Sequence, residues 1–262
     1  MREAGDGWSV AVDVHRELHR GLDALTDGRR AFIRKAVLTL PRLDRPRILD
    51  VGCGRGGPTL ELARLGGGDV IGIDTDARAL DDLAAEAVNA GLSGRVRVRH
   101  CSMEAIEFED GSFDVIWAEA SIHIMGFGEG LQAWRRLLRL EGFVVVHEMA
   151  WLRPDPPREI AAHWMSRFPG IRTVNGYAEE IPRYGYSLLD AFALPVEFWW
   201  DNYFHPLERR IEALRKECER DDAALEALRA QQREVDLYRK YSAWFGSAYW
   251  VMQKQRGWVK PA

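Results

Sequence analysis

The sequence predicts a doubly wound α/β fold, in which helices cover both faces of a mostly parallel β-sheet. Short apolar runs of strand length alternate with helical segments between residues 46 and 150. A glycine-rich segment at residues 52–57 directly follows the first of these runs. Strands that alternate with helices of this length indicate crossover units, which place parallel strands side by side in one buried sheet.

A helical segment is expected at residues 1–45. Apolar residues recur there at three- and four-residue steps between positions 8 and 40, which predicts two amphipathic helices. Pro41 and Pro46 follow this pattern and close the segment, because proline interrupts a helix.

The core at residues 46–150 is expected to contain five strands, each a short run of apolar residues. The predicted strands are residues 47–51, 70–73, 96–98, 113–118 and 143–146. Helices are predicted between them, and Pro58 suits the first position of one because its missing N–H costs nothing there. A second helix is predicted at residues 77–89, and a third presents an apolar face that includes Leu131 and Trp134.

Residues 151–262 are expected to complete the sheet with two further strands, at residues 187–194 and 248–252. A helical cap is predicted from the insertions at residues 151–186 and 195–245. The second insertion is far longer than a hairpin needs, and its aromatic beginning favours a position at the ligand-binding end of the sheet. Its long helices carry balanced charges, which are typical of a solvated face and make a homodimer through the cap conceivable.

The composition excludes several classes of function. The formal net charge of -4 provides no field that would attract polyanions, so no nucleic acid is expected as a partner. The three cysteines have no Cys-x-x-Cys spacing, which predicts free thiols in a reducing compartment and no metal site. No run of about 18 apolar residues occurs, so we expect a cytoplasmic protein without a membrane partner.

The first predicted strand runs into a glycine loop, which lets a ligand approach bare backbone N–H groups. Gly52, Gly54 and Gly57 fit the pattern G-x-G-x-x-G, so a nicotinamide dehydrogenase remains an alternative. Asp50, inside the strand, would oppose a pyrophosphate but suits a cationic ligand. Asp74 ends the next strand, where it can bind both hydroxyls of a ribose. A ligand with a ribose, a positive charge and no phosphate is S-adenosylmethionine.

With these features the sequence resembles the class I S-adenosylmethionine-dependent methyltransferases of the small-molecule type. The resemblance covers residues 47–149 and includes the glycine loop, residues 70–74 and the run FEDGSFDVI at residues 108–116. It implies a Rossmann-like sheet with N-terminal helices and a helical cap, and S-adenosyl-L-methionine as cofactor, with S-adenosyl-L-homocysteine as product. The cofactor-binding residues that it implies are Asp50, Gly52, Gly54, Gly56, Asp74, Thr75, Ser102 and Met103.

Two further residues are expected at the cofactor. Cys53 lies in the glycine loop, where it would contribute backbone and not act as a nucleophile. Glu119 follows the fourth predicted strand, so we expect it to face the cationic end of the cofactor; a salt bridge elsewhere is the alternative.

Catalytic residues are expected directly after the strands, where the ligand crevice of a parallel sheet lies. His123 is the predicted base, because the pKa of an unperturbed histidine lies near neutrality, and Glu148 is the second predicted catalytic residue. Trp151, Trp200 and Tyr203 are predicted to bind the acceptor through their aromatic faces. Structural packing is the alternative for all of these side chains.

The predicted function is direct in-line methyl transfer from S-adenosylmethionine to a small-molecule acceptor. A non-catalytic regulator or complex subunit that binds the same cofactor is the alternative, and Glu119, His123 and Glu148 are the residues that separate the two. An RNA or protein methyltransferase would need a basic surface or a recognition module, and the sequence contains neither.

Overall fold

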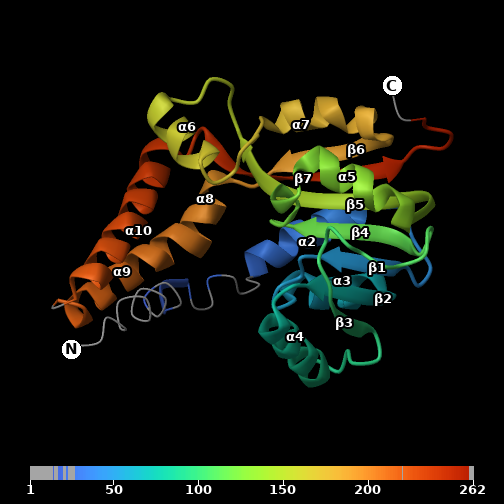
Figure 1. Ribbon diagram of the computed structural model, residues 1–262, viewed down its shortest axis with the longest axis horizontal. Coiled ribbons are helices and arrows are strands. Elements are labelled where there is room, and N and C mark those ends of the chain that lie inside the picture. Colours follow the sequence, from blue (N-terminus) through green and yellow to red (C-terminus); the bar gives the residue numbers. More distant parts are fainter. Residues whose placement is uncertain (1–13, 15–16, 20–21, 23–26, 220, 260–262) are drawn as a thin grey trace, which may run out of the picture.

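A computed structural model describes residues 14, 17–19, 22, 27–219 and 221–259 of the chain (Figure 1). Of the two predicted N-terminal helices, the second corresponds to α2 (Asp27–Thr39). The first lies largely outside the described residues.

Seven strands form one sheet in the order β3-β2-β1-β4-β5-β7-β6. They are β1 (Arg47–Val51), β2 (Asp69–Asp74), β3 (Val96–His100), β4 (Phe113–Glu119), β5 (Leu138–Trp151), β6 (Tyr186–Ala193) and β7 (Phe245–Lys254). The first five strands pair in parallel, and β7 runs antiparallel to both β5 and β6. This confirms the predicted fold class. The strand order reverses between β1 and β4, and ligands of such sheets bind beyond the carboxyl ends of the strands at this point.

The longest strand, β5, extends well beyond the predicted residues 143–146. The next two residues, His147 and Glu148, are polar, yet both side chains are buried. The carboxyl half of β5 is held by its pairing with β7, which runs from Phe143 opposite Gln253 to Trp151 opposite Phe245. Long-range pairing therefore carries two ionisable residues into the middle of the molecule.

Helices cover both faces of the sheet. One face packs against α5 (Phe127–Trp134) and α7 (Val174–Glu180). The other packs against α2, α3 (Gly57–Gly66) and α4 (Ala77–Asn89). As predicted, α3 has a proline at its start.

The remaining helices form a group at one end of the sheet. They are α6 (Arg158–Met165), α8 (Val196–Trp199), a π-helical turn (Trp200–Phe204), α9 (His205–Glu217) and α10 (Asp222–Tyr241). Figure 1 shows this group beyond the end to which the arrow of β1 points. These helices share an apolar cluster with Trp151 at the end of β5 and Phe245 at the start of β7. We call the group the cap. None of the helices in the described part of the chain is long and apolar enough to span a membrane.

Candidate functional site

The glycine loop after β1 lies against the ends of β2 and β4. The backbone N–H groups of Gly52 and Cys53 both donate to the carbonyl of Ile73, at 2.9 and 3.0 Å. Gly52 has φ +70°, and a Cβ atom there would lie 2.5 Å from the Cβ atom of Ser121. Only glycine combines this left-handed backbone with so close an approach. The residues that follow β4 therefore begin directly beside the loop.

Asp74 fastens this loop to the end of β2. One of its carboxylate oxygens accepts the N–H of Gly54 at 2.8 Å, and the other accepts the N–H of Asp76 at 2.9 Å. The predicted ribose-binding acid thus lies directly against the glycine loop. Thr75, the next residue, places its carbonyl oxygen 2.9 Å from Nε2 of His100.

Asp50 is a buried acid, with 1% of its surface exposed. The hydroxyl of Thr59 donates a hydrogen bond to it at 2.6 Å. Burial raises the pKa of Asp50 to about 7 against the lowering effect of Thr59, and the charges of Glu119 and Asp74 raise it further. The ionised form of a carboxylate in this position is stabilised by a nearby cation.

Two further predicted cofactor residues, Ser102 and Met103, follow β3. The side chain of Met103 reaches within 3.4 Å of the position that a Cβ on Gly52 would take, and its carbonyl accepts the indole N–H of Trp134 at 3.2 Å. The hydroxyl of Ser102 accepts the N–H of Glu104 at 3.2 Å. Burial raises the pKa of the Cys53 thiol, so it is a poor nucleophile.

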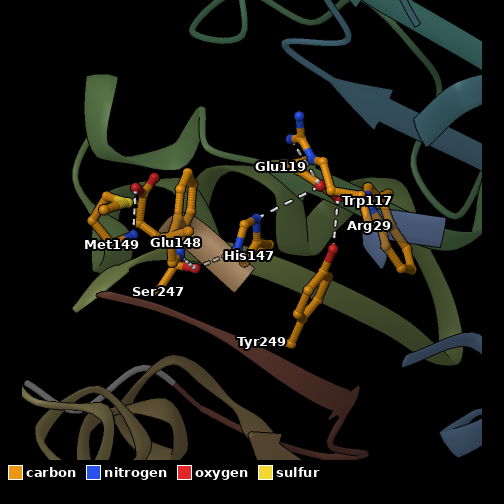
Figure 2. Close-up of polar contacts among 9 residues, drawn as sticks. Arg29, Trp117, Glu119, His147, Glu148, Met149, Ser247 and Tyr249 are labelled. Carbon is orange, nitrogen blue, oxygen red and sulfur yellow. Dashed lines mark hydrogen bonds and ion pairs between the residues drawn. The ribbon is translucent and has the colours of Figure 1, made fainter. Parts of the chain in front are cut away.

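Glu119 is held in a polar network on the α2 face of the sheet (Figure 2). Its Oε2 atom accepts from the indole N–H of Trp117 and the hydroxyl of Tyr249, both at 3.1 Å. Its Oε1 atom lies 3.3 Å from Nη2 of Arg29 and 3.6 Å from Nδ1 of His147. The structure thus gives Glu119 the ion pair that was the alternative to cofactor contact.

His147 extends this network toward the cap. Its Nε2 atom lies 2.8 Å from Oγ of Ser247, and the indole N–H of Trp199 donates to the same hydroxyl at 3.0 Å. Its ring stacks on that of Tyr249, with 4.4 Å between ring centroids. Burial lowers the pKa of His147, which favours the neutral imidazole. Sequence reasoning missed this network because Arg29, Ser247 and Trp199 lie far from β5 along the chain.

The structure brings the two predicted catalytic residues together. Nδ1 of His123 lies 2.8 Å from Oε2 of Glu148, on the opposite face of the sheet from His147. The backbone N–H groups of His123 and Met149 also donate to this carboxylate, at 3.3 and 2.8 Å. Glu148 is buried, whereas 32% of the His123 side chain is exposed. If Nδ1 carries the proton that Glu148 accepts, Nε2 is left as the basic nitrogen.

A cavity of about 280 Å³ opens beside this pair. His123 and Glu148 form part of its wall, and the segment between α6 and α7 forms another part. The lining residues that sequence reasoning missed include Phe168, Arg172, Tyr177, Glu180 and Tyr184. They follow no predicted strand, so the rule that found His123 did not find them.

The three aromatic residues predicted to bind the acceptor lie elsewhere. Trp151 is buried edge-on against Phe245 in the cap cluster. Trp200 lies parallel to the ring of His205, with the guanidinium of Arg239 4.8 Å from its centroid. Tyr203 packs in the same cluster. None of the three lines the His123 cavity, and their contacts are those of the packing alternative.

No group of three or more His, Cys, Asp or Glu side chains in the described ranges is arranged to hold a metal ion.

The chain is similar in sequence to known methyltransferases. Residues 48–142 match the family model of a methyltransferase domain. The 24-methylenesterol C-methyltransferase 2 of Oryza sativa subsp. japonica is 30% identical over 167 residues, which cover 59% of this chain and 46% of that protein. The match therefore spans less than half of the length of this curated relative.

Two solved structures show the same fold. An S-adenosylmethionine-dependent methyltransferase from Geobacter sulfurreducens, in complex with S-adenosyl-L-homocysteine, superposes with a TM-score of 0.75 at 19% identity. That match covers 97% of this chain and 100% of the other. The [4+2]-cyclase SpnF superposes with a TM-score of 0.72 at 24% identity, covering 97% of this chain and 95% of the cyclase.

Proposed function

We propose that the chain methylates a small-molecule acceptor, because residues 48–142 match the family model of a methyltransferase domain. The observation that carries the proposal is the hydrogen-bonded pair of His123 and Glu148 in the wall of a cavity. Ser121 connects this pair to the glycine loop, since it touches the Gly52 position and lies two residues before His123.

The residues around the glycine loop fit S-adenosylmethionine, which supplies an activated methyl group on a sulfonium when it is bound. Asp50 offers a buried negative charge to a cation, and Asp74 offers acceptor oxygens at the edge of the loop. These groups suit a ligand that has a positive charge and hydroxyl groups but no phosphate. Asp50, Asp74, Met103 and the loop backbone are therefore the proposed cofactor site.

His123 is the proposed base. Glu148 fixes the orientation of the imidazole and stabilises its protonated form, so Nε2 can take a proton from the acceptor. A base is needed only if the reacting atom carries a proton at neutral pH, as a hydroxyl or an ammonium group does. We therefore propose an acceptor of this kind.

The size of the cavity supports a small acceptor. Ligand pockets of proteins are commonly about 300–1,000 Å³. At about 280 Å³, this cavity would hold a small molecule or the reacting end of a larger one. The next experiment is to identify that molecule.

The SpnF comparison supplies a specific reason to consider a second function. A protein of this fold that is described as a [4+2]-cyclase is 24% identical to this chain. The second candidate is therefore a cofactor-binding protein that does not transfer the methyl group, either a regulator or an enzyme of another reaction.

Labelled cofactor separates these candidates. The protein would be incubated with methyl-labelled S-adenosylmethionine and a metabolite extract, and labelled products identified by mass spectrometry. We expect a labelled product with the wild type and none with His123→Asn, whose side chain can still bond to Glu148. Binding of S-adenosyl-L-homocysteine to both proteins without any labelled product would instead favour the second candidate.

A further inference from the structure

A ring contact joins the proposed base to the segment between α6 and α7. The rings of His123 and Phe168 meet edge-on, with 4.9 Å between centroids and 74° between planes. Glu148 holds one nitrogen of the imidazole, and Phe168 packs against the ring. The orientation of His123 therefore depends on where Phe168 is held.

The residue before Phe168 is attached to the cap. Nη1 of Arg167 lies 2.6 Å from Oε2 of Glu234, a largely buried residue of α10. The same guanidinium atom lies 2.8 Å from Nε2 of His163, and the group packs over the ring of Trp164 at 5.5 Å. A short, partly buried bond between charged groups is stronger than an exposed ion pair.

The far end of the segment has its own attachment. Arg172 pairs with Glu180 of α7 at 2.9 Å, and its carbonyl accepts the N–H of Trp151 at 2.9 Å. Between the two ends, Gly170 has φ +84° and open space where a Cβ would be. The segment is thus held at both ends, and the contact with α10 is the one nearer to Phe168.

We propose that Glu234 is a positioning residue for His123, acting through Arg167 and Phe168. By this arrangement α10 of the cap sets the orientation of the imidazole and the shape of the cavity beside it. The consequence for catalysis rests on the proposed function, whereas the positioning itself can be measured without an acceptor.

Two variants break the link from opposite sides. Glu234→Gln removes the negative charge on α10, and Arg167→Gln removes the positive charge on the segment between α6 and α7. Because the side chain of Arg167 is partly exposed, we expect no fold defect in Arg167→Gln. Glu208→Gln is the matched control: Glu208 of α9 also pairs with an arginine at 2.6 Å, but its partner, Arg239, belongs to α10 and not to the segment that carries Phe168.

Two readouts report on His123 itself. The first is its Cε1 proton resonance, which the ring of Phe168 shifts; Phe168→Leu gives the reference without that ring. The second is the rate at which diethyl pyrocarbonate modifies His123, followed by peptide mass spectrometry. In Glu234→Gln and Arg167→Gln we expect the resonance to move toward the Phe168→Leu position and the rate to rise about threefold or more. Glu208→Gln should change neither.

The double variant Arg167→Glu with Glu234→Arg restores opposite charges and should return both readouts toward the wild-type values. Unchanged His123 signals in Arg167→Gln would overturn the proposal, and so would equal changes in Glu208→Gln, which would mean general loosening of the cap. Calorimetry with S-adenosyl-L-homocysteine is a separate arm, in which the dissociation constant should stay within about twofold. Failure of the wild type to bind it would count against the proposed function and leave the His123 result standing.

Discussion

The carboxylate of Asp74 accepts a hydrogen bond from the backbone N–H of Gly54 at 2.8 Å, so the acid at the end of β2 lies directly against the loop that follows β1. Its second oxygen is bonded by the N–H of Asp76. An ionised carboxylate oxygen has two lone-pair sites, so each can accept a ligand hydroxyl in addition to its present bond.

From this geometry we expect Asp74→Ala to weaken binding of S-adenosyl-L-homocysteine by about 1.5–3 kcal/mol, the range for hydrogen bonds to a charged group. Titration calorimetry on the folded variant measures it. Asp69→Ala is the control, because Asp69 is exposed at the opposite end of β2. Equal affinities in the Asp74 variant and the wild type would refute the assignment of Asp74 to the ribose.

Asp50 should make both stability and cofactor binding depend on pH. Its pKa is about 7 in the folded protein, above the ordinary value of 3.8. The folded state therefore keeps a proton that the unfolded chain loses, so the free energy of unfolding should fall as the pH rises from about 4 to about 7. The loss should level off above that range and be absent in Asp50→Asn.

Binding of S-adenosylmethionine should show the opposite trend, because a cation favours the ionised form of Asp50. If only that form binds, affinity should drop about fivefold between pH 7 and pH 6, with release of a proton on binding. Calorimetry in two buffers of different ionisation enthalpy measures the proton. A flat affinity profile with no proton release would argue against a cation at Asp50.

The positions of the proposed cofactor residues follow from local sequence patterns more directly than those of the residues around the cavity, for a physical reason. Asp50, Gly52 and Asp74 lie at the ends of strands whose apolar runs are local and easily recognised. From the sequence, His123 and Glu148 could be expected to lie at the same edge of the sheet, but not to contact each other. Their 2.8 Å contact depends on the register of β4 against β5.

The positions of the cap side chains depend on packing that no local pattern encodes. The aromatic run at Trp200 and Tyr203 follows β6 and for that reason was predicted to bind the acceptor. Instead, Trp200–Phe204 form a π-helical turn that packs against α10. There the ring of Phe204 stacks on that of Tyr238, with 3.9 Å between ring centroids. Likewise, Phe168 reaches His123 through tertiary contacts alone.

Glu148 should be important for stability as well as for the proposed chemistry. Glu148→Ala would leave the N–H groups of His123 and Met149 without their acceptor in a buried site, so we expect a loss of about 2–4 kcal/mol. Glu148→Gln keeps one acceptor oxygen and should lose less. Urea denaturation compares both with Glu129→Gln, a change at an exposed position of the same cavity wall. Equal stabilities of all three variants would contradict the buried pair.

Nicotinamide and flavin dinucleotides should not bind, although the loop satisfies G-x-G-x-x-G. Their pyrophosphate would be placed close to Asp50, whose carboxylate is buried and repels an anion. Thermal-shift measurements with NAD, FAD and S-adenosyl-L-homocysteine provide the comparison. Stabilisation by NAD at micromolar concentration with none from S-adenosyl-L-homocysteine would reverse the assignment of the domain.

The aromatic residues of the cap should affect stability before they affect the acceptor. Tyr203 packs in the cap cluster, so Tyr203→Ala should lower the free energy of unfolding by about 2–4 kcal/mol through loss of apolar contacts. Trp200 is half-buried, packs against the same cluster and lies beneath Arg239, so Trp200→Ala should cost about 1–3 kcal/mol through lost apolar contacts and the lost cation–π contact. Denaturation curves give both values, and the dissociation constant of S-adenosyl-L-homocysteine should stay within about threefold in each variant. If Trp200→Ala left stability unchanged but abolished formation of the labelled product, Trp200 would be an acceptor contact after all, and the acceptor would have to reach beyond the His123 cavity into the cap.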